Sequence, residues 1–206
     1  MPILRSAPAQ SRMKTSRLEA FSDGVLAIII TIMVLELKVP HATELAALKP
    51  ILPVLLSYVL SFIYLGIYWN NHHHLFQAAK EVSGGILWAN LHLLFWLSLF
   101  PFTTGWMGQN HLAPTPTAVY GFVLLMAAIA YYILQRAIMA KEGRDSLIRS
   151  AVGRDWKGKL SPVLYLCAIP LAFVNSWIAG GLYVFVALLW LIPDPRIERE
   201  LEKREE

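Results

Sequence analysis

Six blocks of apolar residues constrain the fold of this chain more than any other feature of its sequence. In chain order they cover residues 21–37, 51–69, 84–106, 119–134, 162–173 and 177–192. A helix needs about 20 mostly apolar residues to cross a bilayer, and the first four blocks reach or nearly reach that length. We therefore expect an all-α, polytopic membrane protein with six transmembrane helices. The last two blocks are short and are expected to form a hairpin joined at residues 175–181, with a re-entrant or interfacial pair as the alternative.

Composition and charge agree with this class and predict an orientation. Hydrophobic residues make up 56% of the chain and charged residues only 16%. A soluble domain of this length would need more charged residues to cover its surface. Every Lys and Arg except Lys38 and Lys49 precedes the first block, follows the last, or lies in the second or fourth connection between blocks. With six spans these places share one side of the membrane, and the positive-inside rule makes that side the cytosol. We expect a multi-pass protein of the cell (plasma) membrane with both termini cytosolic.

The same distribution predicts the domains and the partners. Residues 1–16 are expected to form a cytosolic tail, residues 17–193 the six-helix transmembrane domain, and residues 194–206 a charged cytosolic tail. Juxtamembrane basic residues meet anionic lipid more often than nucleic acid, so membrane lipids are expected partners and nucleic acid is not. The single cysteine, Cys167, lies inside an apolar block, which leaves no intrachain disulfide and no thiolate metal site.

Polar residues inside a span are costly, so the start of the first block is the first candidate site. It reads Arg17-Leu-Glu-Ala-Phe21-Ser22-Asp23-Gly24. In one interpretation, Ser22 or Asp23 only caps the start of a helix. In the other, Asp23 needs a partner. Arg17 is six residues away on a different helix face, so that partner must lie on another helix or another subunit.

A single helical stripe continues along the first block. Ile28, Thr31 and Leu35 recur at helical spacing, and Gly24 extends the stripe by one turn. A threonine in such a stripe ordinarily hydrogen-bonds a carbonyl of its own helix. The alternative is that the stripe faces a symmetric pore, where rings of apolar side chains gate by dewetting and a ring of hydroxyls exchanges with the hydration shell of an ion.

The second and third blocks contribute further polar residues. Three consecutive histidines begin at His72. Neighbours on a helix point about 100° apart and cannot close around one ion, so no fixed metal site is expected. One of these histidines could instead hydrogen-bond the region of Asp23. Asn90 and His92 are expected to form hydrogen bonds between helices.

These residues carry a resemblance to a known family. Arg-x-x-x-Phe-Ser-Asp-Gly, from Arg17 to Gly24, resembles the signature that opens the first helix in the transmembrane protein 175 family, the lysosomal-type potassium channels and their prokaryotic relatives. Trp69-x-x-His72-x-x-Leu-Phe and the stretch from Asn90-Leu to Pro-Phe at residues 101–102 are similar to its second and third helices. The resemblance covers the first half of the chain and, after residue 117, rests mainly on helix count.

The resemblance implies a potassium-selective leak channel that is not an enzyme and has no cofactor. Prokaryotic members have six helices per chain and form homotetramers. Their pore is lined by the first helix, with apolar constrictions and a Thr ring in place of a carbonyl filter. Those positions correspond here to Ile28, Thr31 and Leu35, with K⁺ expected to pass transiently near Thr31. The family's structural network near the pore corresponds here to Arg17, Phe21, Ser22, Asp23, His72 and Asn90.

Two other classes of function stay open at the level of sequence. A secondary transporter is expected to contain inverted repeats and helices broken near the midplane. Pro170 is the one midspan candidate for such a break, and no repeat is visible. An intramembrane enzyme needs a convergent nucleophile and base or a set of metal ligands. Asp23 and His72 offer only part of such a site.

Overall fold

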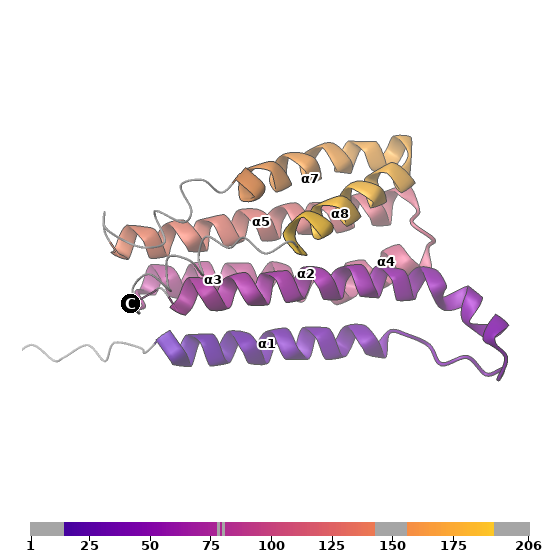
Figure 1. The fold of residues 1–206 in the computed structure, drawn as a ribbon, viewed down its shortest axis with the longest axis horizontal. Helices are drawn as coiled ribbons and strands as arrows, with labels where there is room; N and C mark the ends of the chain where they lie inside the picture. The colour runs from indigo at the N-terminus through magenta and orange to yellow at the C-terminus, as the bar shows by residue number, and fades with distance from the viewer. Residues whose placement is uncertain (1–14, 78, 80, 143–155, 192–206) are drawn as a thin grey trace, which may run out of the picture.

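The computed structural model describes residues 15–77, 79, 81–142 and 156–191, and these residues form helices and short connections without any strand. Figure 1 shows the helices running back and forth along one long axis. In chain order they are α1 (Thr15–Leu35), a short 3₁₀ helix η1 (Leu45–Ile51), α2 (Leu52–Gln77), α3 (Gly84–Ser98), α4 (Phe100–Gln109), α5 (Pro114–Glu142), α7 (Trp156–Val174) and α8 (Ser176–Leu191). Most of the two predicted tails lies outside the described residues.

The expected all-α, multi-pass architecture is confirmed. Five segments of the described chain are long and apolar enough to span a membrane, with η1 and α2 counted as one segment and α3 and α4 as another. The span made by α3 and α4 is interrupted at Leu99, and Pro101 occupies the first turn of α4, where its missing N–H has no partner to lose. The segment that corresponds to the sixth predicted span, α8, has only 16 residues and is about 24 Å long, shorter than a hydrocarbon core of about 30 Å.

The connection between the last two helices differs from the expectation. A hairpin turn was predicted over residues 175–181, but α7 and α8 are joined by Asn175 alone, and the two glycines at 180 and 181 lie inside α8. The side-chain oxygen of Asn175 accepts a hydrogen bond from the backbone N–H of Trp177 at 3.0 Å, which caps the new helix at once. Gly180 does not serve a turn; it lies where Leu112 packs closely on α8, and a Cβ added at residue 180 would stand 3.0 Å from the Leu112 side chain.

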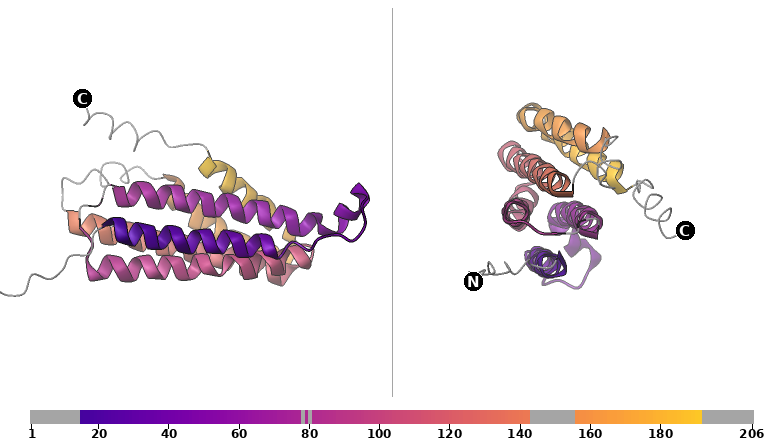
Figure 2. Two further views of the ribbon diagram at one scale, coloured as in Figure 1. Left: turned by 90° about the horizontal axis from the view of Figure 1, so that it is seen from below. Right: turned by 90° about the vertical axis from the view of Figure 1, so that its left-hand side faces the viewer.

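The helices are arranged with α1 at one edge of the bundle. α1 packs on α2, α3 and α4, whereas α5 packs on α3, α4, α7 and α8. The end-on view in Figure 2 shows α1 at the margin, on the side away from α7 and α8. Its outer face is therefore not covered by any other described helix of the same chain.

Three tyrosine hydroxyls in the interior are satisfied by bonds between helices. Tyr64 donates to the carbonyl of Tyr183 at 2.6 Å, Tyr165 donates to the hydroxyl of Tyr64 at 3.2 Å, and Tyr183 donates to the carbonyl of Thr117 at 3.1 Å. Because water is absent from the bilayer core, each of these groups needs a partner within the protein. These bonds tie α2, α5, α7 and α8 into one block, against which the edge helix is placed.

A second hydroxyl cluster connects that block to the edge helix. The Ser61 hydroxyl lies 2.6 Å from that of Thr104 and 2.9 Å from that of Tyr120, and Thr104 in turn contacts the sulfur of Met33 on α1 at 3.9 Å. The cluster therefore joins residues of α2, α4 and α5 beneath the buried face of α1.

Candidate functional site

The edge helix α1 has two distinct faces. The buried face carries Leu18, Ser22, Leu26, Ile29 and Met33. The opposite face carries the predicted stripe, in which Ile28 is 60% and Leu35 is 76% exposed in the single chain. Thr31 lies between them and is also exposed. An apolar stripe with this exposure, on a helix at the edge of a membrane bundle, is a surface that another copy, a pore or lipid must cover.

The hydroxyl of Thr31 donates to the carbonyl of Ala27, one turn back, at 2.8 Å. This is the ordinary interpretation of a threonine in a helix, and it uses the only hydrogen of the hydroxyl. The two lone pairs of the oxygen remain on the exposed side of α1, where they can accept a ligand. The backbone bond and the coordination of a cation by Thr31 are therefore compatible.

Behind the stripe, the buried face of α1 is held by a chain of hydrogen bonds from three helices. Ser22 donates to the carbonyl of Leu18 at 2.9 Å, and Asn90 Nδ2 donates to Ser22 Oγ at 2.9 Å. Asn90 Oδ1 is left to accept from His72 Nε2 at 2.8 Å. The direction of these bonds places the proton of a neutral His72 on Nε2, so Nδ1 is an acceptor, and it has no hydrogen-bond partner among the described residues. Ser22, Asn90 and His72 are all buried.

The carboxylates of α1 lie beside this network at the half-exposed contact between α1 and α2. Trp69 Nε1 donates to Asp23 at 3.0 Å, and His73 Nδ1 lies 2.6 Å from Glu19. On its other side, His73 Nε2 lies 2.8 Å from the amide nitrogen of Gln77. That nitrogen can only donate, so His73 accepts at Nε2 and donates from Nδ1 to the Glu19 carboxylate.

The structure brings together only part of the predicted network. Ser22, His72 and Asn90 form one hydrogen-bonded unit, and Asp23 lies beside it on Trp69. Arg17 and Phe21 are exposed, and Arg17 makes no hydrogen bond or ion pair with the part of the chain that is described.

Two finer expectations were wrong, and a third holds for the region but not for the residue. Ser22 and Asp23 do not cap the start of α1, because the helix already includes Thr15 and places them inside it. A histidine does bond the region of Asp23, since His73 Nδ1 lies 2.6 Å from Glu19, but Asp23 itself bonds Trp69. His92 accepts a bond from Trp96 at 3.0 Å within its own helix rather than from another helix.

Sequence reasoning missed Glu19, Trp69 and His73, although a signal for them exists. Glu19 and Asp23 are four residues apart on α1, and Trp69 and His73 are four residues apart on α2. Two such pairs on adjacent antiparallel helices can meet partner to partner. The hydroxyl cluster of Ser61, Thr104 and Tyr120 had no comparable pattern, because its members come from three separate helices.

The fold and this site define a multi-pass helical membrane protein. The sequence model of the family described as the endosomal/lysosomal potassium channel TMEM175 matches residues 17–101. A potassium channel of Chryseobacterium sp. (strain P1-3) is 58% identical over 93% of this chain and 100% of its own length. A potassium channel of Chamaesiphon minutus is 30% identical over 90% of this chain and 97% of its own. A crystal structure of a lysosomal potassium-selective channel TMEM175 homologue from Chamaesiphon minutus has a TM-score of 0.76 at 28% identity, covering 86% of this chain and 96% of that one.

The chain belongs to the TMEM175 family. The family is one of ion channels and not of enzymes, so the intramembrane-enzyme alternative is excluded.

Proposed function

We propose that four copies of this chain form a potassium-selective leak channel of the cell membrane, with α1 of each copy lining a central pore. The observation that carries the proposal is the exposed stripe of Ile28, Thr31 and Leu35 on an edge helix. The two similar bacterial proteins named as potassium channels support the choice of ion.

The pore requires several copies, because one chain with one such stripe cannot enclose it. Copies of α1 must then meet on a symmetry axis, and closed rotational symmetry is the rule for homo-oligomers. The position of α1 at the margin of the bundle suits this arrangement, and the number four follows the family resemblance. Mass measurement or cross-linking of the purified protein in a mild detergent tests the assembly, and a result of monomers alone would refute the central pore.

The order of residues along the stripe suggests how ions are handled. Ile28 and Leu35 lie about 10 Å apart along the helix, with Thr31 between them. Rings of Ile and Leu side chains resist wetting, so an ion crossing them loses water without receiving ligands. A ring of Thr31 hydroxyls returns oxygen ligands between the two constrictions. Because potassium is dehydrated more easily than sodium, partial compensation at that ring favours potassium.

We assign the end of the bundle that holds Thr15, Gln77 and Trp156 to the cytosol; it is called the basic end below. The basic residues described at the ends of α5 and α7 lie there, whereas Lys38 and Lys49 are at the opposite end. This distribution supports the assignment through the positive-inside rule. Labelling of cysteines introduced at Lys38 and at Lys141, with an impermeant reagent on intact cells, tests it; only the Lys38 position is expected to react.

Single-channel recording distinguishes this function from the remaining alternative, a secondary transporter. The purified protein in a planar bilayer with asymmetric potassium is expected to give discrete current steps that reverse close to the potassium equilibrium potential. Slow, saturating flux without discrete steps would favour a transporter and would contradict the proposed pore.

A further inference from the structure

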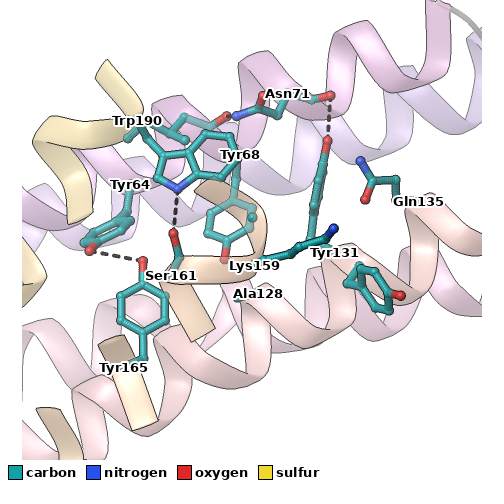
Figure 3. Close-up of a pocket in the computed structure, with 13 residues that line it drawn as sticks. Tyr64, Tyr68, Asn71, Ala128, Tyr131, Gln135, Lys159, Ser161, Tyr165 and Trp190 are labelled. Carbon is teal, nitrogen blue, oxygen red and sulfur yellow. Dashed lines mark hydrogen bonds between the residues drawn. The ribbon is translucent and has the colours of Figure 1, made fainter. Parts of the chain in front are cut away.

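A cavity lies between α2, α5, α7 and α8, on the opposite side of α2 from the helix that carries the stripe. Its volume is about 80 Å³, several times the roughly 10–15 Å³ that one water molecule needs. Six of the thirteen lining residues are aromatic, among them Tyr64, Tyr68, Tyr165 and Trp190, and Ala128 also lines the cavity (Figure 3). A space of this size with an apolar lining is suited to part of a hydrocarbon chain rather than to a cluster of waters.

The geometry of α8 accounts for the cavity. α2 and α5 continue past it toward the basic end, as far as Gln77 and Glu142, whereas helix α8 ends at Leu191 beside it. Trp190, in the last turn of α8, donates to Ser161 on α7 at 2.9 Å and closes one wall. Among the described residues, the mouth of the cavity therefore lies on the basic side, toward the membrane leaflet there.

Three polar groups of the lining have no partners among the described residues. The Lys159 amine, the Gln135 amide and the Tyr68 hydroxyl line the cavity and form no hydrogen bond or ion pair within the described part of the chain. No carboxylate is among the described residues that line the cavity. A second cation stands at its edge, since the Arg136 guanidinium lies 5.7 Å from the centre of the Tyr132 ring, which is part of the lining.

We propose that this cavity binds an anionic phospholipid from the leaflet at the basic end, with part of one acyl chain between the aromatic side chains and the phosphate at Lys159. An aromatic body and a cationic mouth, with no carboxylate among the described lining residues, match a negatively charged amphiphile, and the bilayer supplies this molecule at high local concentration. The chain's own residues 192–206 fit less well, because they alternate acidic with basic residues and contain few apolar ones. The proposal does not depend on the pore, because it concerns helices on the other side of the bundle.

Native mass spectrometry of the full-length protein tests the head-group contact. The protein is titrated with phosphatidylglycerol and, separately, with phosphatidylcholine of the same chain length. The first tightly bound lipid is expected to be phosphatidylglycerol, and Lys159→Ala is expected to weaken its binding about fivefold, the effect of one interfacial cation. Lys141→Ala is the matched control, because Lys141 is on the same side of the membrane, pairs with Glu81 at 3.6 Å, and does not line the cavity. Its effect is expected to be less than twofold.

A second arm tests the acyl-chain contact. Ala128→Phe places a large side chain in the cavity and is expected to abolish binding of the first lipid. Ala140→Phe, at an exposed position of the same helix, is expected to leave that binding intact. A phosphatidylglycerol with a photoreactive acyl chain is expected to label peptides of α2 and α5 that line the cavity. Equal binding of the two lipids, equal effects of Lys159→Ala and Lys141→Ala, or labelling that avoids these peptides would each overturn the proposal. The Lys159 variant alters only an exposed side chain and therefore keeps the test decisive if Ala128→Phe fails to fold.

Discussion

Replacement of Asn90 by alanine is expected to loosen α1 from the rest of the bundle. Asn90 is buried on α3 and is the only described residue that bonds both Ser22 on α1 and His72 on α2. The substitution removes both bonds. Ser22 keeps its partner, the carbonyl of Leu18, but the Nε2–H of His72 is left without one.

The expected cost follows from those bonds. Hydrogen bonds between helices in a membrane contribute about 0.6 kcal/mol each on average. A buried donor without a partner costs about 1–3 kcal/mol in addition. The small space left by the amide adds a few tenths of a kcal/mol at about 24 cal/mol per Å³ of cavity. The free energy of unfolding should therefore fall by about 2.5–4.5 kcal/mol.

Reversible unfolding of the purified protein in mixed detergent micelles measures this change. Asn110→Ala is the matched control, because Asn110 is exposed and its side chain bonds only the carbonyl of Trp106 in its own helix. Its effect should stay within about 0.5 kcal/mol. A second comparison adds His72→Phe to Asn90→Ala. The double variant has no unpaired His72 N–H, and the ring of the introduced phenylalanine takes the place of the imidazole. Its loss of unfolding free energy should therefore be smaller than the sum of the losses in the two single variants.

Two results would refute the reasoning. If Asn90→Ala destabilised the protein no more than Asn110→Ala, the network would not hold α1. If the double variant lost the full sum of the single effects, the cost would not arise from the unpaired His72 donor, and the bonding assigned to the three side chains would be wrong.

The remaining predictions concern the stripe and the core. Thr31→Val should lower the potassium-to-sodium permeability ratio measured from reversal potentials in mixed solutions, and an unchanged ratio in an intact oligomer would show that Thr31 only bonds its own helix. Ile28→Asn should raise conductance or leak in the same recordings by wetting the constriction, so an unchanged current would remove Ile28 from the ion path. Gly121→Ala should destabilise by about 1–3 kcal/mol in unfolding measurements, because its Cβ would overlap the Tyr183 hydroxyl, whereas Gly66→Ala, with nothing within 4 Å, should be neutral or slightly stabilising.

Much of the fold was predictable from the sequence because one physical requirement dominates it. A bilayer-spanning helix needs a long apolar run, and the apolar runs at residues 51–69 and 84–106 predict such helices directly. The ends were less predictable. α5 runs from Pro114 to Glu142, well beyond the apolar block of residues 119–134. Its last turns are polar, so hydrophobicity alone does not mark where the helix ends. The join at Asn175 was also missed, since a single capping residue can reverse the chain where a longer turn was expected.

The candidate site was predictable where it depends on one helix and not where it depends on several. Helical spacing alone places Ile28, Thr31 and Leu35 on one face, and all three are exposed together in the structure. The partner of His72 depends on how α3 crosses α2, and no periodicity encodes that crossing. The sequence therefore predicts that His72 and Asn90 belong to the network, but it does not predict the hydrogen bond between them.

The charged groups of α1 are arranged in a way that connects its stability to its proposed role. Asp23 receives the indole N–H of Trp69, and Glu19 receives the N–H of His73, whose other nitrogen is occupied by Gln77. Both carboxylates are thus oriented by N–H groups of α2, and the Trp69 indole, which carries no charge, leaves the charge of Asp23 uncancelled. The buried network beside them is neutral, as the cost of charge in a low dielectric requires. In the proposed tetramer the negative charge therefore stays at the half-exposed basic end of the pore helix, where it raises the local concentration of cations, while the apolar stripe beyond it controls their passage.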